Sequence, residues 1–166
     1  MTQVSDRIEK KIQLNAPREK VWQAIIDPRQ FGSWFGVRFE EGPFEVGTLT
    51  VGRITPTTVD PEVARLQKPF EGTPFHIVVD RIEQMTRFAF RWHPFAADEA
   101  PEGEPTTLVE FALADCHLGT ELTITETGFD ALPEGRREEA FANNAGGWEH
   151  QAHLLEKYLL GAGEDG

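Results

Sequence analysis

The end of the chain carries apolar side chains that recur every three or four residues. From about Glu134 to Leu160 the steps between them alternate between four and three, the spacing that places side chains on one face of an α-helix. The positions in this stripe are Phe141, Ala145, Trp148, Ala152, Leu155 and Leu159. We expect Gly161 to stop the helix and residues 161–166 to form a frayed tail. Such a helix has to bury its stripe against a second layer supplied by the rest of the chain.

Strands are the main elements that the preceding residues predict. The candidate strands cover residues 7–14, 44–54, 75–82, 87–93, 106–114 and 120–127. Most of their connections are short and turn-like, which favours antiparallel pairing because parallel pairs need long crossovers. Two longer connections stand apart: residues 55–74, with four prolines, are expected to form an insertion over one edge, and residues 96–105 are acidic.

Two short helices are predicted directly after the first strand. Asn15 offers an N-cap, Pro17 suits a first helical turn, and apolar residues follow at helical spacing, so residues 16–27 should form a helix. Asp27-Pro28 ends it, and a second helical piece is expected over 29–34. The order of elements predicts an α+β domain with an antiparallel sheet and a long C-terminal helix.

Length and charge narrow the possible partners. A chain of 166 residues suits one domain, here 1–166 with its core in 7–160. The formal net charge of -12 argues against nucleic acid and against an anionic membrane surface. The chain shows no signal peptide and no apolar run that would span a bilayer, and its single cysteine, Cys116, fits a reducing compartment. We therefore expect a cytoplasmic protein.

The aromatic residues are mostly of the kind that fills cores or lines cavities, with 12 Phe and 4 Trp against 1 Tyr. In the strand over 87–93, Phe88, Phe90 and Trp92 share one face, which should turn towards the long helix. This row either packs as ordinary core against Phe141 and Trp148 or forms one wall of a cavity. The residues alone leave both interpretations open.

Two polar features break the local pattern. Glu126 is in phase with Leu122 and Ile124, so its carboxylate lies either on the dry face of the sheet, as a site candidate, or past the rim. Glu110 alternates with its apolar neighbours and should face outward.

Residues 143–147 (NNAGG) place weak helix formers inside the helix. These residues either allow close packing or a kink of the helix, or they form a flexible segment that gates a cavity.

Motifs for catalysis, metals or cofactors are weak. His150 and His153 lie three residues apart, but both fall on the helix side opposite the apolar stripe, so we expect no metal site. Cys116-His117 has no third group to orient it, and the glycine-rich run over 161–166 follows a helix instead of opening one. We expect no cofactor and identify no catalytic residue, although an enzyme using Glu126 or His76 stays open.

Three segments carry a resemblance to a known family. They are residues 14–22 (LNAPREKVW) with Asp27-Pro28 and Trp34-Phe35 after them, residues 119–129 (GTELTITETGF), and Gly147-Trp148 with Leu155 and Leu159. In this order they resemble the START-like, helix-grip (SRPBCC) proteins over about 7–160, apart from the two long connections. The chain is most similar to the branch named for the C-terminal domain of the activator of the ninety-kilodalton heat-shock chaperone's ATPase.

The resemblance implies a curved antiparallel sheet gripping the C-terminal helix, with an apolar cavity between them. The superfamily includes carriers of hydrophobic ligands, polyketide cyclases and chaperone partners, so fold alone does not decide the function. Our leading hypothesis is non-catalytic binding of a small hydrophobic or aromatic molecule. The alternatives are a co-chaperone-like interaction with a protein and a cyclase- or hydrolase-type enzyme. The expected ligand-binding residues are Trp34, Phe88, Phe90, Trp92, Phe111, Phe141 and Trp148, with Glu126 and His76 as possible polar site residues.

Overall fold

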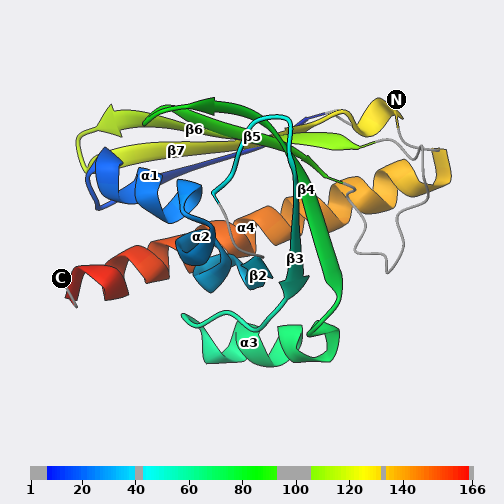
Figure 1. The fold of residues 1–166 in the computed structure, drawn as a ribbon. Coiled ribbons are helices and arrows are strands. Elements are labelled where there is room, and N and C mark those ends of the chain that lie inside the picture. The colour runs from blue at the N-terminus through cyan, green and yellow to red at the C-terminus, as the bar shows by residue number, and fades with distance from the viewer. Residues whose placement is uncertain (1–6, 40–42, 93–105, 132–133, 165–166) are drawn as a thin grey trace.

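Seven strands form a single antiparallel sheet in the described part of the chain. The computed structural model describes residues 7–39, 43–92, 106–131 and 134–164 (Figure 1), so the acidic segment 96–105 lies outside it. The strand order across the sheet is β1-β7-β6-β5-β4-β3-β2. The strands are β1 (Arg7–Leu14), β2 (Val37–Phe39), β3 (Leu49–Ile54), β4 (Pro74–Glu83), β5 (Arg87–Trp92), β6 (Thr107–Cys116) and β7 (Gly119–Thr127).

Helices cover one face of this sheet. They are α1 (Arg18–Ile26), α2 (Pro28–Phe35) and α4 (Glu134–Glu164). The chain also forms helix α3 (Pro61–Gln67) and short 3-10 turns η1 (Lys68–Phe70) and η2 (Phe129–Ala131). The sheet arches over α4, while α1 and α2 lie beside it and α3 lies beyond the ends of β3 and β4 (Figure 1). This is the predicted helix-grip α+β fold. Among the described residues, no helix is both long and apolar enough to span a membrane.

Because successive side chains of a strand point to opposite faces of the sheet, every second side chain points towards α4. On β7 every second residue from Thr120 to Glu126 is buried, and β6 has the same period from Thr107. Phe88 and Phe90 on β5 are also fully buried, as expected for the row that faces the helix. On α4, the predicted stripe is buried at Trp148 and continues through Ala152, Leu155 and Leu159.

Helix ends differ from the sequence-based expectation at two points. Helix α1 begins at Arg18 with Pro17 at its N-cap and no side-chain hydrogen bond there, so the predicted cap at Asn15 is wrong. Helix α4 continues through Gly161 to Glu164, so Gly161 does not stop it. Glycine permits a left-handed helix end but does not require one, because its helical conformation remains accessible.

The region between α2 and β4 also differs from expectation. The strand expected over 44–54 begins only at Leu49, because a turn precedes it in which Gly47 adopts a left-handed φ of 82°. Strand β2 was not predicted, since three residues are too few to show a period. It pairs with β3 and forms one edge of the sheet.

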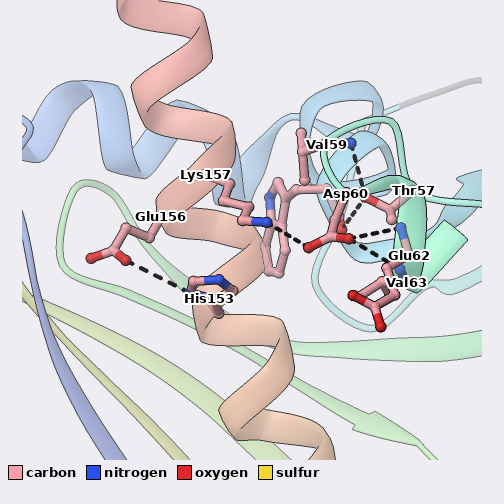
Figure 2. Close-up of polar contacts among 9 residues, drawn as sticks. Thr57, Val59, Asp60, Glu62, Val63, His153, Glu156 and Lys157 are labelled. Carbon is pink, nitrogen blue, oxygen red and sulfur yellow. Dashed lines mark hydrogen bonds and ion pairs between the residues drawn. The ribbon is translucent and has the colours of Figure 1, made fainter.

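The proline-containing insertion 55–74 contains a helix, α3, that the sequence reading missed. Asp60 caps this helix, because its Oδ1 accepts hydrogen bonds from the backbone N–H groups of Glu62 (3.0 Å) and Val63 (3.1 Å). The Lys157 Nζ on α4 donates to Asp60 Oδ2 at 2.6 Å. Figure 2 shows both sets of contacts meeting at this one carboxylate. The insertion is thereby tied to the C-terminal helix.

The ion pair between Asp60 and Lys157 should weaken at low pH. The hydrogen bond from Lys157, followed by that from the Val63 amide, holds the pKa of Asp60 below its ordinary value of 3.8. When the pKa of a carboxyl group is lower in the folded protein than in the unfolded chain, its ionised form stabilises the fold. This stabilisation is fully present at a pH above the pKa in the unfolded chain, and it is lost as the pH falls through the pKa in the folded protein. We expect Lys157→Met to lower the melting temperature by a few degrees at pH 7, and this difference to shrink progressively below pH 3.8.

The matched control is Lys11→Met, which removes the same charge from an exposed position on β1. Melting curves of the three proteins from pH 7 to pH 2 measure the effect. A Lys157→Met deficit that stays constant through this range would contradict the assignment to Asp60.

Candidate functional site

Glu126 is a carboxylate inside the apolar layer between the sheet and α4. Its exposed fraction is 0%, and it follows Leu122 and Ile124 in the buried row of β7. It pairs with Ile8 of β1 on one side and Val109 of β6 on the other. Of the two placements that the sequence left open, the structure therefore shows the dry face of the sheet and not a position past its rim.

Four side chains donate hydrogen bonds to this carboxylate. Trp92 Nε1 (2.9 Å) and Thr107 Oγ1 (2.5 Å) donate to Oε2, and Trp148 Nε1 donates to Oε1 (2.8 Å). Asn144 Nδ2 lies 3.0 Å from both oxygens. Strands β5, β6 and β7 and helix α4 thus meet at one charged group, and we call these five residues the Glu126 cluster.

The described residues around Glu126 provide hydrogen-bond donors and no cation. Within the described ranges, no Lys, Arg or His forms an ion pair with it, and the indole and amide N–H groups around it can only donate. Hydrogen bonds compensate the cost of burying a carboxylate, whereas an apolar residue of similar size would incur no such cost. A buried ionisable group that the fold itself does not require marks a candidate functional site.

Aromatic rings surround the cluster. The rings of Trp92 and Trp148 lie 5.5 Å apart, and Phe111 meets the Trp148 ring edge-on at 5.7 Å. Phe75 packs against Trp92 (5.7 Å) and Phe35 against Trp148 (6.1 Å). Trp92 is partly exposed while Trp148 is 2% exposed, so the cluster lies deep in the core but borders the surface at Trp92.

Other expected ligand-binding residues lie further away from Glu126. Phe88 and Phe90 are fully buried on β5; Phe90 packs against Trp92 at 5.5 Å, and Phe88 stacks on Phe44 at 5.1 Å. They continue the same aromatic row away from the carboxylate. The structure thus brings Trp92 and Trp148 to Glu126 directly, Phe111 through Trp148, and Phe90 through Trp92.

Trp34, Phe141 and His76, which were also expected at the site, lie on other parts of the fold. Trp34 is buried in α2, where its Nε1 donates to the backbone oxygen of Ala24 at 2.9 Å. Phe141 packs against Phe129 of η2 at 5.2 Å. His76 is exposed on the outer face of β4, so the sheet separates it from the carboxylate.

The comparisons with known proteins agree with this architecture. The family model described as Activator of Hsp90 ATPase homolog 1-like protein matches residues 15–160. The chain belongs to this family. No curated protein matches it. In this family member, the segments 119–129 and 147–159 that carried the resemblance meet at the hydrogen bond between Trp148 and Glu126.

Solved structures share the helix-grip fold. Protein MLL2253 of Mesorhizobium loti is 20% identical, with a TM-score of 0.66 and coverage of 92% of this chain and 96% of that one. A protein of Arthrobacter aurescens is also 20% identical, with a TM-score of 0.67 and coverage of 93% and 86%. DynU16, from the dynemicin biosynthetic locus, is 25% identical, with a TM-score of 0.65 and coverage of 94% of this chain and 48% of DynU16. This chain therefore spans about half the length of DynU16.

Sequence reasoning missed two members of the cluster, Thr107 and Asn144. Thr107 shares the buried period of β6, so its phase was a usable signal. Asn144 belongs to the 143–147 segment, whose weak helix formers had been noted. A Cβ at Gly146 or Gly147 would meet nothing within 4 Å, so close packing does not explain these glycines.

Metal binding has no support in the described residues. They contain no group of three or more His, Cys, Asp or Glu side chains arranged to hold an ion, and His150 and His153 are exposed. A structural metal contributes directly to folding free energy. We therefore expect EDTA to leave the melting temperature unchanged in a thermal scan, and a fall of several degrees would contradict this expectation.

Proposed function

We propose that this protein binds a small apolar or aromatic molecule between the sheet and α4, at the Glu126 cluster. The observation that carries the proposal is a fully buried carboxylate that forms no ion pair with a described Lys, Arg or His and lies among the rings of Trp92, Trp148, Phe111, Phe75 and Phe35. Ligand sites combine an apolar lining with a few placed polar groups that orient the ligand. The cluster supplies both elements at the place where the fold family has its cavity.

Trp92 is the side chain that would admit the ligand. It is partly exposed at the end of β5, while Trp148 behind it is buried. In this structure the aromatic rings contact one another, so a ligand enters as Trp92 turns outward. Trp92 then withdraws its N–H from Glu126, and a donor group on the ligand can take that place.

Binding without catalysis accounts for the contacts of Glu126 better than acid–base chemistry does. Its partners are two indoles, an amide and a hydroxyl, none of which exchanges a proton readily near neutral pH. Acid–base catalysis by two groups would need a second titratable side chain close to Glu126, and the described hydrogen-bond partners include none. The exposed His76 does not supply one.

A protein-interaction role has one observation in its favour. Leu66 on α3 and Phe70 on η1 are 65% and 57% exposed, although both are large and apolar. Exposed apolar side chains on a helical insertion suit a protein partner. This role is compatible with ligand binding at the cluster, which lies on other elements.

Titration with the uncharged apolar dye Nile red tests the proposal. We expect saturable binding by the native protein, at least tenfold weaker binding by Trp92→Ala, and an intermediate effect of Trp92→Phe, which keeps a ring but loses the N–H. The matched control is Trp22→Phe, at a tryptophan that is 3% exposed on α1. Equal dye affinity of the native protein and folded Trp92→Ala would overturn the proposal.

A further inference from the structure

A wide surface groove lies on other elements of the fold. It is formed by the end of α1, the first half of α2, strand β2 and the first residues of the insertion, and its volume is about 1010 Å³. None of its lining residues belongs to the Glu126 cluster. The volume is ample for a small organic molecule, because ligand pockets usually measure about 300–1,000 Å³.

Two arginines, Arg29 and Arg38, line the groove. Neither Arg29 nor Arg38 forms an ion pair with any residue that the structure describes. Several other described basic side chains form ion pairs, because the net charge of -12 makes carboxylates plentiful. Examples at N···O distances of 2.6–3.8 Å are Arg18–Asp115, Arg81–Glu83, Arg87–Glu110, Arg91–Asp80 and Lys157–Asp60.

The charges of the groove suit a single negative charge. Asp27, the one carboxylate among the described lining residues, accepts hydrogen bonds from the backbone N–H of Arg29 (3.0 Å) and from Gln30 Nε2 (3.3 Å), and from neither guanidinium group. The two guanidinium groups and the one carboxylate of the described lining together carry a net charge of one positive. A carboxylate matches this balance better than a phosphate, which carries more than one negative charge near pH 7.

The rest of the lining indicates an apolar body on the ligand. Ile26 and Phe39 lie in the groove together with several prolines, while Ser33 and Thr58 provide hydroxyl groups. The two hydroxyl oxygens lie 2.6 Å apart and form a hydrogen bond with each other, so this part of the groove is polar but uncharged. A molecule with one anionic end and an apolar end would contact both parts of the groove.

We propose that this groove is a second ligand site, which binds small organic monocarboxylates through Arg29 and Arg38. Guanidinium groups bind carboxylates through paired, charge-assisted hydrogen bonds. The site is independent of the proposed function, because the Glu126 cluster is negative and lies on other elements.

Backbone and indole N–H resonances in an NMR titration with octanoate test this site. We expect saturable shifts at Arg29, Ser33, Arg38 and Thr58, and none at the indole N–H groups of Trp92 and Trp148. Arg29→Ala and Arg38→Ala should each weaken octanoate binding about tenfold, and added salt should weaken it in the native protein. The matched control is Arg65→Ala, on exposed α3 outside the groove, which should bind as the native protein does.

Comparison ligands separate the possible outcomes. Octanol should bind more weakly than octanoate, since it lacks the charge, and octyl phosphate should not bind more tightly. Equal affinity of octanol would overturn the role of the arginines, and tighter binding of octyl phosphate would overturn the monocarboxylate assignment. Octanoate shifts confined to the tryptophan indoles would place this ligand at the Glu126 cluster and overturn the second site while supporting the first.

Discussion

Trp148→Ala should remove about 3–5 kcal/mol from the free energy of unfolding, the usual cost of truncating a buried aromatic residue to alanine. Trp148 is 2% exposed, packs against the rings of Trp92, Phe111 and Phe35, and donates to Glu126. Domains are stable by only about 5–15 kcal/mol, so the variant should be largely unfolded at physiological temperature. Urea denaturation followed by far-ultraviolet circular dichroism measures the loss.

The comparison variant is Trp92→Ala, because Trp92 donates to the same carboxylate but is partly exposed. We expect this variant to stay folded and to lose ligand uptake. If both variants lose equal stability and neither changes dye binding, the aromatic row is ordinary core and the proposed ligand site is wrong.

Glu126→Gln should destabilise the protein by about 1–3 kcal/mol, although it changes the shape of the side chain very little. The glutamine NH₂ group replaces one carboxylate oxygen and faces donors, so at least one buried N–H loses its acceptor. Thermal and urea denaturation at pH 7 measure the change. Glu126→Ala should cost more, because it leaves all four donors without their acceptor.

Glu110→Gln is the matched control for this substitution. Glu110 lies on β6 and faces outward as predicted, in an exposed contact of 3.4 Å with Arg87. Exposed ion pairs contribute about 0–1 kcal/mol, so the control should be close to the native protein. Equal stability of Glu126→Gln and Glu110→Gln would show that the hydrogen bonds of the cluster contribute nothing specific.

The fold was predictable because its main elements each bury one face. The period of two in β6 and β7 and the steps of four and three in α4 were visible in the sequence. The structure buries these positions, except that Phe141 and Ala145 of α4 are only partly buried. Helix α3 escaped prediction because it is short and none of its residues is fully buried, so the segment shows no clear apolar stripe, although Asp60-Pro61 was a recognisable helix start.

The candidate site was only partly predictable. The period of two along the strand placed Glu126 on the same face as Leu122 and Ile124. It did not show whether hydrogen-bond donors would surround the carboxylate. Those donors come from residues 18–34 positions away in the sequence, and the pairing of Trp92 with Thr107 depends on the strand register. Register and helix placement are tertiary properties that a local pattern does not contain.

Native mass spectrometry of the protein purified from its own host tests the central claim most directly. If the Glu126 cluster is a ligand site, the folded protein should retain a small organic molecule, seen as a mass above that of the polypeptide that disappears on denaturation. Trp92→Ala should lose this added mass, whereas Trp22→Phe should keep it. A folded native protein that shows only the polypeptide mass, or an added mass that Trp92→Ala retains in full, would contradict the account.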